Sequence, residues 1–129
     1  MKWLIYLSCM LTPLASFASH VELGVDVFFK GAYREKLKGK KVGLVSNHTG
    51  LNKELISTFD LLKKHAKEYK VVALFSPEHG WQGSAYAFEK VADDKSKEIP
   101  IYSLHGATRR PTEQMLKGID TLIFDIQDV

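Results

Sequence analysis

The chain has 129 residues, with 18 Lys and Arg against 15 Asp and Glu, a net charge of +3, and 45% hydrophobic and 26% charged residues. This composition is that of roughly one globular domain, and it excludes disordered, collagen-like and repeat-array proteins. The lysines are scattered and form no basic block with interleaved aromatics, so we expect no nucleic-acid partner. The single cysteine, Cys9, excludes a disulfide framework and a cysteine-based metal site.

The first residues have the order of a targeting segment. Lys2 precedes an apolar run from Trp3 to Leu14, and small residues follow up to Ser19. This order predicts a secretory signal peptide over 1–18, cleaved after Ala18. The run is too short for a stable transmembrane helix, so we expect no membrane insertion after cleavage. The mature domain would then be 19–129, exported to the periplasm or secreted.

Helix and strand patterns alternate along the mature chain. Asp26 could cap a helix over 26–37, and Ser57 or Thr58 could cap a second one through residue 69. Continuous apolar runs predict strands over 41–46 and 71–75. After a polar stretch over 76–98, the pattern predicts a strand over 99–104, a helix over 112–117 ended by Gly118, and a strand over 121–126.

Apolar strands separated by amphipathic helices indicate a parallel sheet that is covered on both faces. We therefore expect an α/β fold with a Rossmann-like sheet. The turn after the first strand, at 47–50, lacks the G-x-G-x-x-G pattern of dinucleotide-binding proteins. We therefore expect no nicotinamide or flavin cofactor.

Polar and charged side chains follow every predicted strand. In an open parallel sheet these carboxyl ends share one edge, where ligands bind. We expect one pocket that is lined by side chains of all four clusters, namely Asn47, His48, Glu78, His79, His105, Arg109, Asp125 and Asp128.

Glu78 stands between Pro77 and Gly80, which would present its carboxyl group rigidly at the cleft. Such a carboxyl suits general acid or base catalysis, although a helix cap or a surface carboxylate is an equal alternative. The neighbouring His79 could orient substrate, ligate a metal or simply pack. Four residues could supply imidazole and carboxylate ligands, but no H-E-x-x-H spacing supports a metal, so we expect none: His48, His79, His105 and Asp125.

Each of the other clusters has a functional and a structural interpretation. Asn47 and His48 could hold sugar hydroxyls or an acetamido group, or could serve turn formation alone. Arg109 and Arg110 could pair with a carboxylate or form a solvated loop. Aromatic side chains in the polar stretch could stack on a sugar or roof the core, and these are Trp81, Tyr86 and Phe88.

Four ordered motifs carry a resemblance to a known family. They cover residues 42–50, 76–80, 109–112 and 124–129 and read VGLVSNHTG, SPEHG, RRPT and FDIQDV. In order and spacing they resemble the NamZ-type exo-β-N-acetylmuramidases. The resemblance implies a glycoside hydrolase that releases N-acetylmuramic acid from the non-reducing ends of peptidoglycan fragments. It also implies an N-terminal Rossmann-like domain with a C-terminal domain that closes the cleft.

The resemblance also implies roles for the site residues. Glu78 would be the general acid, and Asp125 or Glu89 the second carboxyl group, with Asp125 preferred because it stands at a strand end. Arg109 or Arg110 would pair with the lactyl carboxylate of muramic acid. The remaining contacts to the sugar would come from Asn47, His48, His79, Gln127 and Asp128. The sequence departs from the family at Gln82, Tyr86 and Phe88.

The relatives continue beyond the last motif, so we expect the chain to be an incomplete N-terminal piece of a larger enzyme. Its expected partners are muramic-acid-containing saccharides and a separately encoded C-terminal half. The alternative is a non-catalytic or inactive remnant that binds wall fragments without cleaving them.

Overall fold

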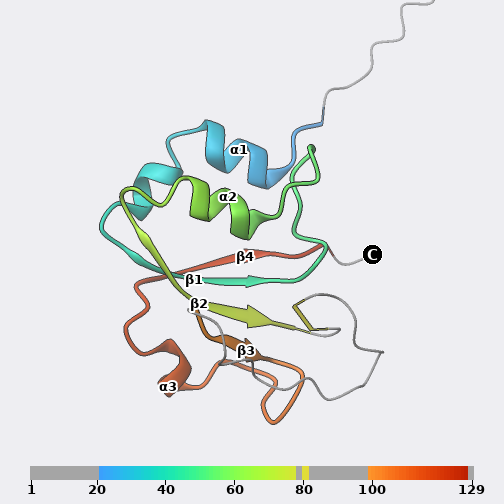
Figure 1. Ribbon diagram of the computed structural model, residues 1–129, viewed down its shortest axis with the longest axis vertical. Helices are drawn as coiled ribbons and strands as arrows, with labels where there is room; N and C mark the ends of the chain where they lie inside the picture. The colour runs from blue at the N-terminus through green and yellow to red at the C-terminus, as the bar shows by residue number, and fades with distance from the viewer. Residues whose placement is uncertain (1–20, 78–79, 82–98, 128–129) are drawn as a thin grey trace, which may run out of the picture.

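The computed structural model describes residues 21–77, 80–81 and 99–127. Its centre is a four-stranded, entirely parallel sheet in the order β3-β2-β1-β4 (Figure 1). The strands are β1 (Lys41–Ser46), β2 (Lys70–Ser76), β3 (Ile101–Ser103) and β4 (Thr121–Asp125). All four predicted strands are therefore confirmed, as is the Rossmann-like α/β class. The predicted signal peptide at 1–18 lies outside the described residues.

The two central strands are the best buried because they have neighbours on both edges. In β1 every residue after Lys41 is buried, and β2 is buried except at Lys70 and Val72. The lateral strand β3 has three residues, fewer than the six predicted, although Leu104 N still donates to Ser76 O at 2.7 Å. Among the described strands β4 pairs with β1 alone, and the alternating exposure of its side chains marks it as an incompletely covered strand.

Three short helices lie on one face of the sheet and one lies on the other (Figure 1). α1 (Gly24–Lys30), the 3₁₀-helix η1 (Arg34–Leu37) and α2 (Thr58–Lys64) cover the first face, and α3 (Glu113–Leu116) the second. The prediction of one helix over 26–37 is wrong, because the helix begins at Gly24 and is interrupted at Gly31. Asp26 does not cap it. Its Oδ2 atom instead accepts a hydrogen bond from Lys53 N at 3.3 Å.

The caps of the other two helices follow the sequence pattern. Ser57 caps α2 and accepts a hydrogen bond from Asp60 N at 3.0 Å. Thr112 caps α3, and Gly118 beyond it adopts a φ of +78°, as expected for a glycine that ends a helix. α2 ends at Lys64, earlier than predicted, because the chain turns at 65–68 before it enters β2.

Apolar side chains on the two faces form separate cores. The core under α1 and α2 centres on Leu44, Leu62 and Leu74, and the smaller core under α3 centres on Val45, Ala73 and Phe75. These residues alternate along β1 and β2, so each central strand contributes to both cores. The alternation fixes the register of the sheet, because a shift by one residue would exchange the two faces.

Tyr69 provides a pH-dependent contact beneath the first core. Its hydroxyl donates to Leu62 O at 2.9 Å, and burial raises the pKa of Tyr69 above 10.0, which Arg34 opposes more weakly. The neutral phenol is thus favoured in the folded state. Its contribution to the free energy of unfolding is therefore full below pH 10 and is lost as the pH rises further. We expect the urea midpoint to fall above pH 10 in the parent, and to fall less in Tyr69→Phe. An equal fall of the urea midpoint above pH 10 in both proteins would contradict this account.

Candidate functional site

The carboxyl ends of β1 and β4 are joined by side-chain hydrogen bonds. Ser46 and Asp125 are partners in the parallel register, and Ser46 Oγ donates to Asp125 O at 2.7 Å. Just beyond the two strands, Thr49 Oγ1 accepts a hydrogen bond from Gln127 N at 3.0 Å. These contacts hold the loop after β1 against the loop after β4. We call the set Ser46, Asn47, Thr49, Thr58, Asp125 and Gln127 the β1–β4 edge cluster.

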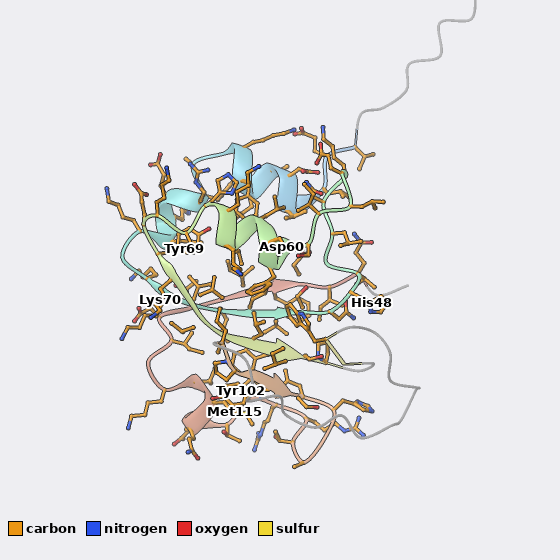
Figure 2. All side chains as sticks on the ribbon, in the orientation of Figure 1. His48, Asp60, Tyr69, Lys70, Tyr102 and Met115 are labelled. Atoms are coloured by element: carbon orange, nitrogen blue, oxygen red, sulfur yellow. The ribbon has the colours of Figure 1, made fainter. Side chains whose placement is uncertain are left out.

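Asn47 forms the turn at the centre of this cluster. Its Oδ1 accepts from both the backbone N and the Oγ1 of Thr49, at 2.9 and 2.6 Å. The amide oxygen is therefore used for turn formation, the structural role considered for this residue, and its NH₂ group remains a donor type suited to a carbonyl or hydroxyl oxygen. The next side chain, His48, is exposed at the same end of the sheet (Figure 2).

Asp125 extends toward the α1–α2 face. Its Oδ2 accepts a hydrogen bond from the hydroxyl of Thr58, the first residue of α2, and Thr58 N donates to Gly50 O at 2.9 Å. Asp125 also lines a cavity of about 190 Å³ between α1, α2 and β4. One oxygen of the predicted second carboxyl group is thus held by the protein, which fixes its orientation.

The bond between Thr58 and Asp125 gives a stability prediction. Thr58→Val keeps the side-chain shape but leaves a half-buried carboxylate without its donor, which we expect to lower the free energy of unfolding by about 2 kcal/mol. Thr58→Ser keeps the hydroxyl and should cost about 1 kcal/mol or less. Urea denaturation of the two variants measures the difference. Equal losses would show that the hydroxyl contributes nothing beyond packing.

The ends of β2 and β3 form the other half of this edge. Ser76 and Ser103 are register partners, and the buried His105 follows, with its backbone N donating to Ser103 Oγ at 3.1 Å. Arg109 Nη1 lies 3.5 Å from His105 Nδ1. Arg109 and Arg110 are both exposed, so their guanidinium groups are accessible to an anion.

Several predicted site residues cannot be placed. The predicted general acid follows β2 between Pro77 and Gly80, whose backbone atoms are joined by a hydrogen bond of 3.3 Å from Gly80 N to Pro77 O. Gly80 has a φ of +73°, a conformation that favours glycine. Four of the predicted residues lie outside the described part of the chain, namely Glu78, His79, Glu89 and Asp128.

Trp81 packs over the first core, with its ring 5.8 Å from that of Phe59 in an edge-to-face arrangement. Trp81 therefore covers the core, which is one of the two roles expected for the aromatic side chains of this stretch. Tyr86 and Phe88 lie outside the described residues.

The described residues contain neither a cluster of metal ligands nor a membrane-spanning helix. No three His, Cys, Asp or Glu side chains within them come together as ligands for a metal ion. No helix within them is long and apolar enough to cross a membrane.

Thr49 and Thr58 were not predicted as site residues. Thr49 could have been found, since it stands two residues after an asparagine at a predicted turn, the spacing of an Asx turn. Thr58 was considered only as a helix cap. Its contact with Asp125 joins residues 67 positions apart, which no local pattern indicates.

The sheet and its polar carboxyl edge define a Rossmann-like α/β domain, a class in which ligands bind at that edge. The chain belongs to the family described as "Exo-beta-N-acetylmuramidase NamZ, N-terminal", whose model matches residues 42–129. This match begins in β1 and contains the whole β1–β4 edge cluster.

Relatives of known sequence and structure agree with this assignment. The chain is 44% identical over 111 residues to the peptidoglycan beta-N-acetylmuramidase NamZ of Bacillus subtilis, covering 84% of this chain and 26% of that protein. Two crystal structures of DUF1343 family proteins from Bacteroides fragilis match with TM-scores of 0.70 and 0.63, at 44% and 37% identity. They cover 84% and 86% of this chain but 26% and 27% of their own chains. The chain thus spans about a quarter of these relatives.

Proposed function

We propose that this chain supplies one wall of the active site of an exported exo-β-N-acetylmuramidase, which releases N-acetylmuramic acid from the non-reducing ends of peptidoglycan fragments. The observation that carries the proposal is the β1–β4 edge cluster, which holds a carboxylate and a side-chain amide at the carboxyl edge of a sheet of this family. Export rests on the charged, apolar and small-residue order of residues 1–18.

Glycoside cleavage needs an acid for the leaving oxygen and a second group for the anomeric centre. We assign the acid to Glu78, directly after β2. Asp125 is the second carboxyl group, and Thr58 holds one of its oxygens so that the other is presented in a fixed direction. Glu89 is the alternative second carboxyl group.

The substrate has a lactyl carboxylate and an acetamido group, and the proposal gives a contact to each. The exposed guanidinium groups of Arg109 and Arg110 match the lactyl carboxylate. The NH₂ group of Asn47 and the imidazole of His48 suit acetamido and hydroxyl oxygens. His79, Gln127 and Asp128 complete the sugar contacts.

A second function is a wall-fragment binding module without catalysis. It is favoured by the fact that the chain spans only about a quarter of its relatives. The discriminating experiment incubates a chromogenic β-N-acetylmuramide with the chain joined to the remaining region of a family member. A hydrolase releases the chromophore, whereas a binder shows a higher melting temperature with free N-acetylmuramic acid and releases nothing.

A further inference from the structure

Lysines that are scattered along the sequence come together at the amino-terminal end of the sheet. Lys41 and Lys70 begin β1 and β2 and are register partners. Figure 2 shows Lys70 at this end of the sheet and His48 at the opposite, carboxyl end. We call the exposed lysines of the amino-terminal end the lysine patch, and they are Lys38, Lys41, Lys64, Lys67, Lys70 and Lys117.

The turns that carry the patch are fixed to one another by backbone hydrogen bonds. Lys70 N donates to Lys40 O at 3.0 Å, which joins the turn before β2 to the turn before β1. Asp120 N donates to Lys41 O at 2.8 Å, which joins the turn before β4 to β1. The sheet therefore sets the positions of the lysines relative to one another.

Carboxylates do not pair with the lysines of this patch in the described part of the chain. The ion pairs there join Lys30 to Glu22 and Lys53 to Glu54, and neither lysine belongs to the patch. Helix dipoles favour the lysines at the ends of α2 and α3, but the lysines that begin β1 and β2 have no such structural role. Their charges thus add to a positive potential at this end of the sheet.

The lysine patch extends over two grooves on opposite faces of the sheet. The groove on the α2 side has a volume of about 550 Å³ and is lined by more cations than carboxylates, namely Arg34, Lys38, Lys64 and Lys67 against Glu35 and Glu68. The groove on the α3 side has a volume of about 340 Å³, and its charged lining residues are Lys41, Lys70 and Lys117. The positive charge therefore surrounds the end of the sheet and does not converge on one point.

This distribution fits a broad anionic surface better than a single small anion. Lysine is a strongly hydrated point charge without the fork of donors with which arginine grips one carboxylate or phosphate. Anionic lipid surfaces attract such clusters by long-range electrostatics. We propose that the lysine patch holds the domain against an anionic phospholipid surface without insertion, so that the carboxyl edge with His48 faces away from the membrane (Figure 2). This inference is independent of the proposed activity.

The test measures cosedimentation with vesicles of phosphatidylcholine that contain about 30% phosphatidylglycerol. The protein used is residues 19–129 joined to the remaining region of the Bacillus subtilis relative, because the apolar run within 1–18 would itself bind lipid. We expect binding to these vesicles and none to pure phosphatidylcholine. Binding should weaken at least about tenfold when the salt concentration rises from roughly 0.05 to 0.3 M, because salt screens exposed charges.

Single substitutions locate the contact. Lys67→Gln and Lys117→Gln, one from each groove, should each weaken vesicle binding about fivefold. Lys53→Gln is the matched control, since Lys53 is an equally exposed lysine in the loop that follows the carboxyl end of β1, and it should leave vesicle binding unchanged.

Four results would overturn the proposal. They are equal binding to neutral vesicles, equal effects of Lys67→Gln and Lys53→Gln, tighter binding to duplex DNA than to the anionic vesicles, and an effect of Lys67→Gln without one of Lys117→Gln. The last result would assign a soluble anion to the groove on the α2 side. None of these readouts requires catalysis, so a failure of the proposed activity is distinguishable from a failure of this inference.

Discussion

Glu78→Gln is expected to reduce the release of N-acetylmuramic acid by about 10³-fold, because a general acid contributes roughly 10² to 10⁴ to the rate. The change removes one ionisable proton and keeps the size of the side chain. We therefore expect the melting temperature to stay within about 1 °C of the parent value. The measurement is chromophore release from a β-N-acetylmuramide by the chain joined to the remaining region of a family member.

The control for this substitution is Glu113→Gln, which changes an exposed carboxylate at the start of α3, away from the carboxyl edge. It should leave the rate unchanged. A substrate with a phenolate of low pKa as leaving group needs less protonation, so it should recover much of the lost rate in Glu78→Gln. A rate loss that is equal for good and poor leaving groups would exclude Glu78 as the acid.

Gly50→Ala is expected to lower the free energy of unfolding by about 3 kcal/mol, because overpacking a close backbone contact costs roughly 1–3 kcal/mol or more. A Cβ atom at this position would overlap Ser46 Oγ and lie 2.8 Å from Asp125 O. Both atoms belong to the hydrogen bond that joins β1 to β4, so neither can move away without breaking it. Urea denaturation gives the loss.

Gly43→Ala is the matched control within the same strand pair. Its new Cβ atom would meet side-chain atoms, with Leu122 Cδ2 at 2.7 Å and both Ile119 Cδ1 and Phe75 Cε2 at 3.1 Å. Leu122 is half exposed and can turn aside, whereas the buried Phe75 ring has to shift slightly, so we expect a loss of about 1 kcal/mol, smaller than that of Gly50→Ala. If Gly43→Ala were the more damaging change, the close approach at Gly50 would not be what holds the two loops together.

The parallel sheet was predictable because its strands are continuous apolar runs that only a doubly covered sheet can bury. The first helix was not, because helical spacing of apolar residues continues through Phe28, Phe29 and Ala32 although the helix breaks at Gly31. Local periodicity also does not show that the helix begins two residues before Asp26, or that the Asp26 carboxylate accepts a hydrogen bond from Lys53 N.

The edge of the sheet was predictable for the same reason, since carboxyl ends of parallel strands must coincide. The contacts within it were not. Thr49 meets Gln127 at a sequence separation of 78, and Thr58 meets Asp125 at a separation of 67. Such pairs depend on the register between β1 and β4, which only the assembled sheet defines.

The most direct test of the proposed function is one release assay on a chromogenic β-N-acetylmuramide, performed with the chain alone and with the chain joined to the remaining family region. The account predicts release by the joined protein and its loss in Glu78→Gln. It also predicts that the chain alone, which spans about a quarter of its relatives, is inactive or nearly so. If the joined protein released no chromophore but N-acetylmuramic acid raised its melting temperature, the hydrolase proposal would be contradicted. The protein would then be a binding module.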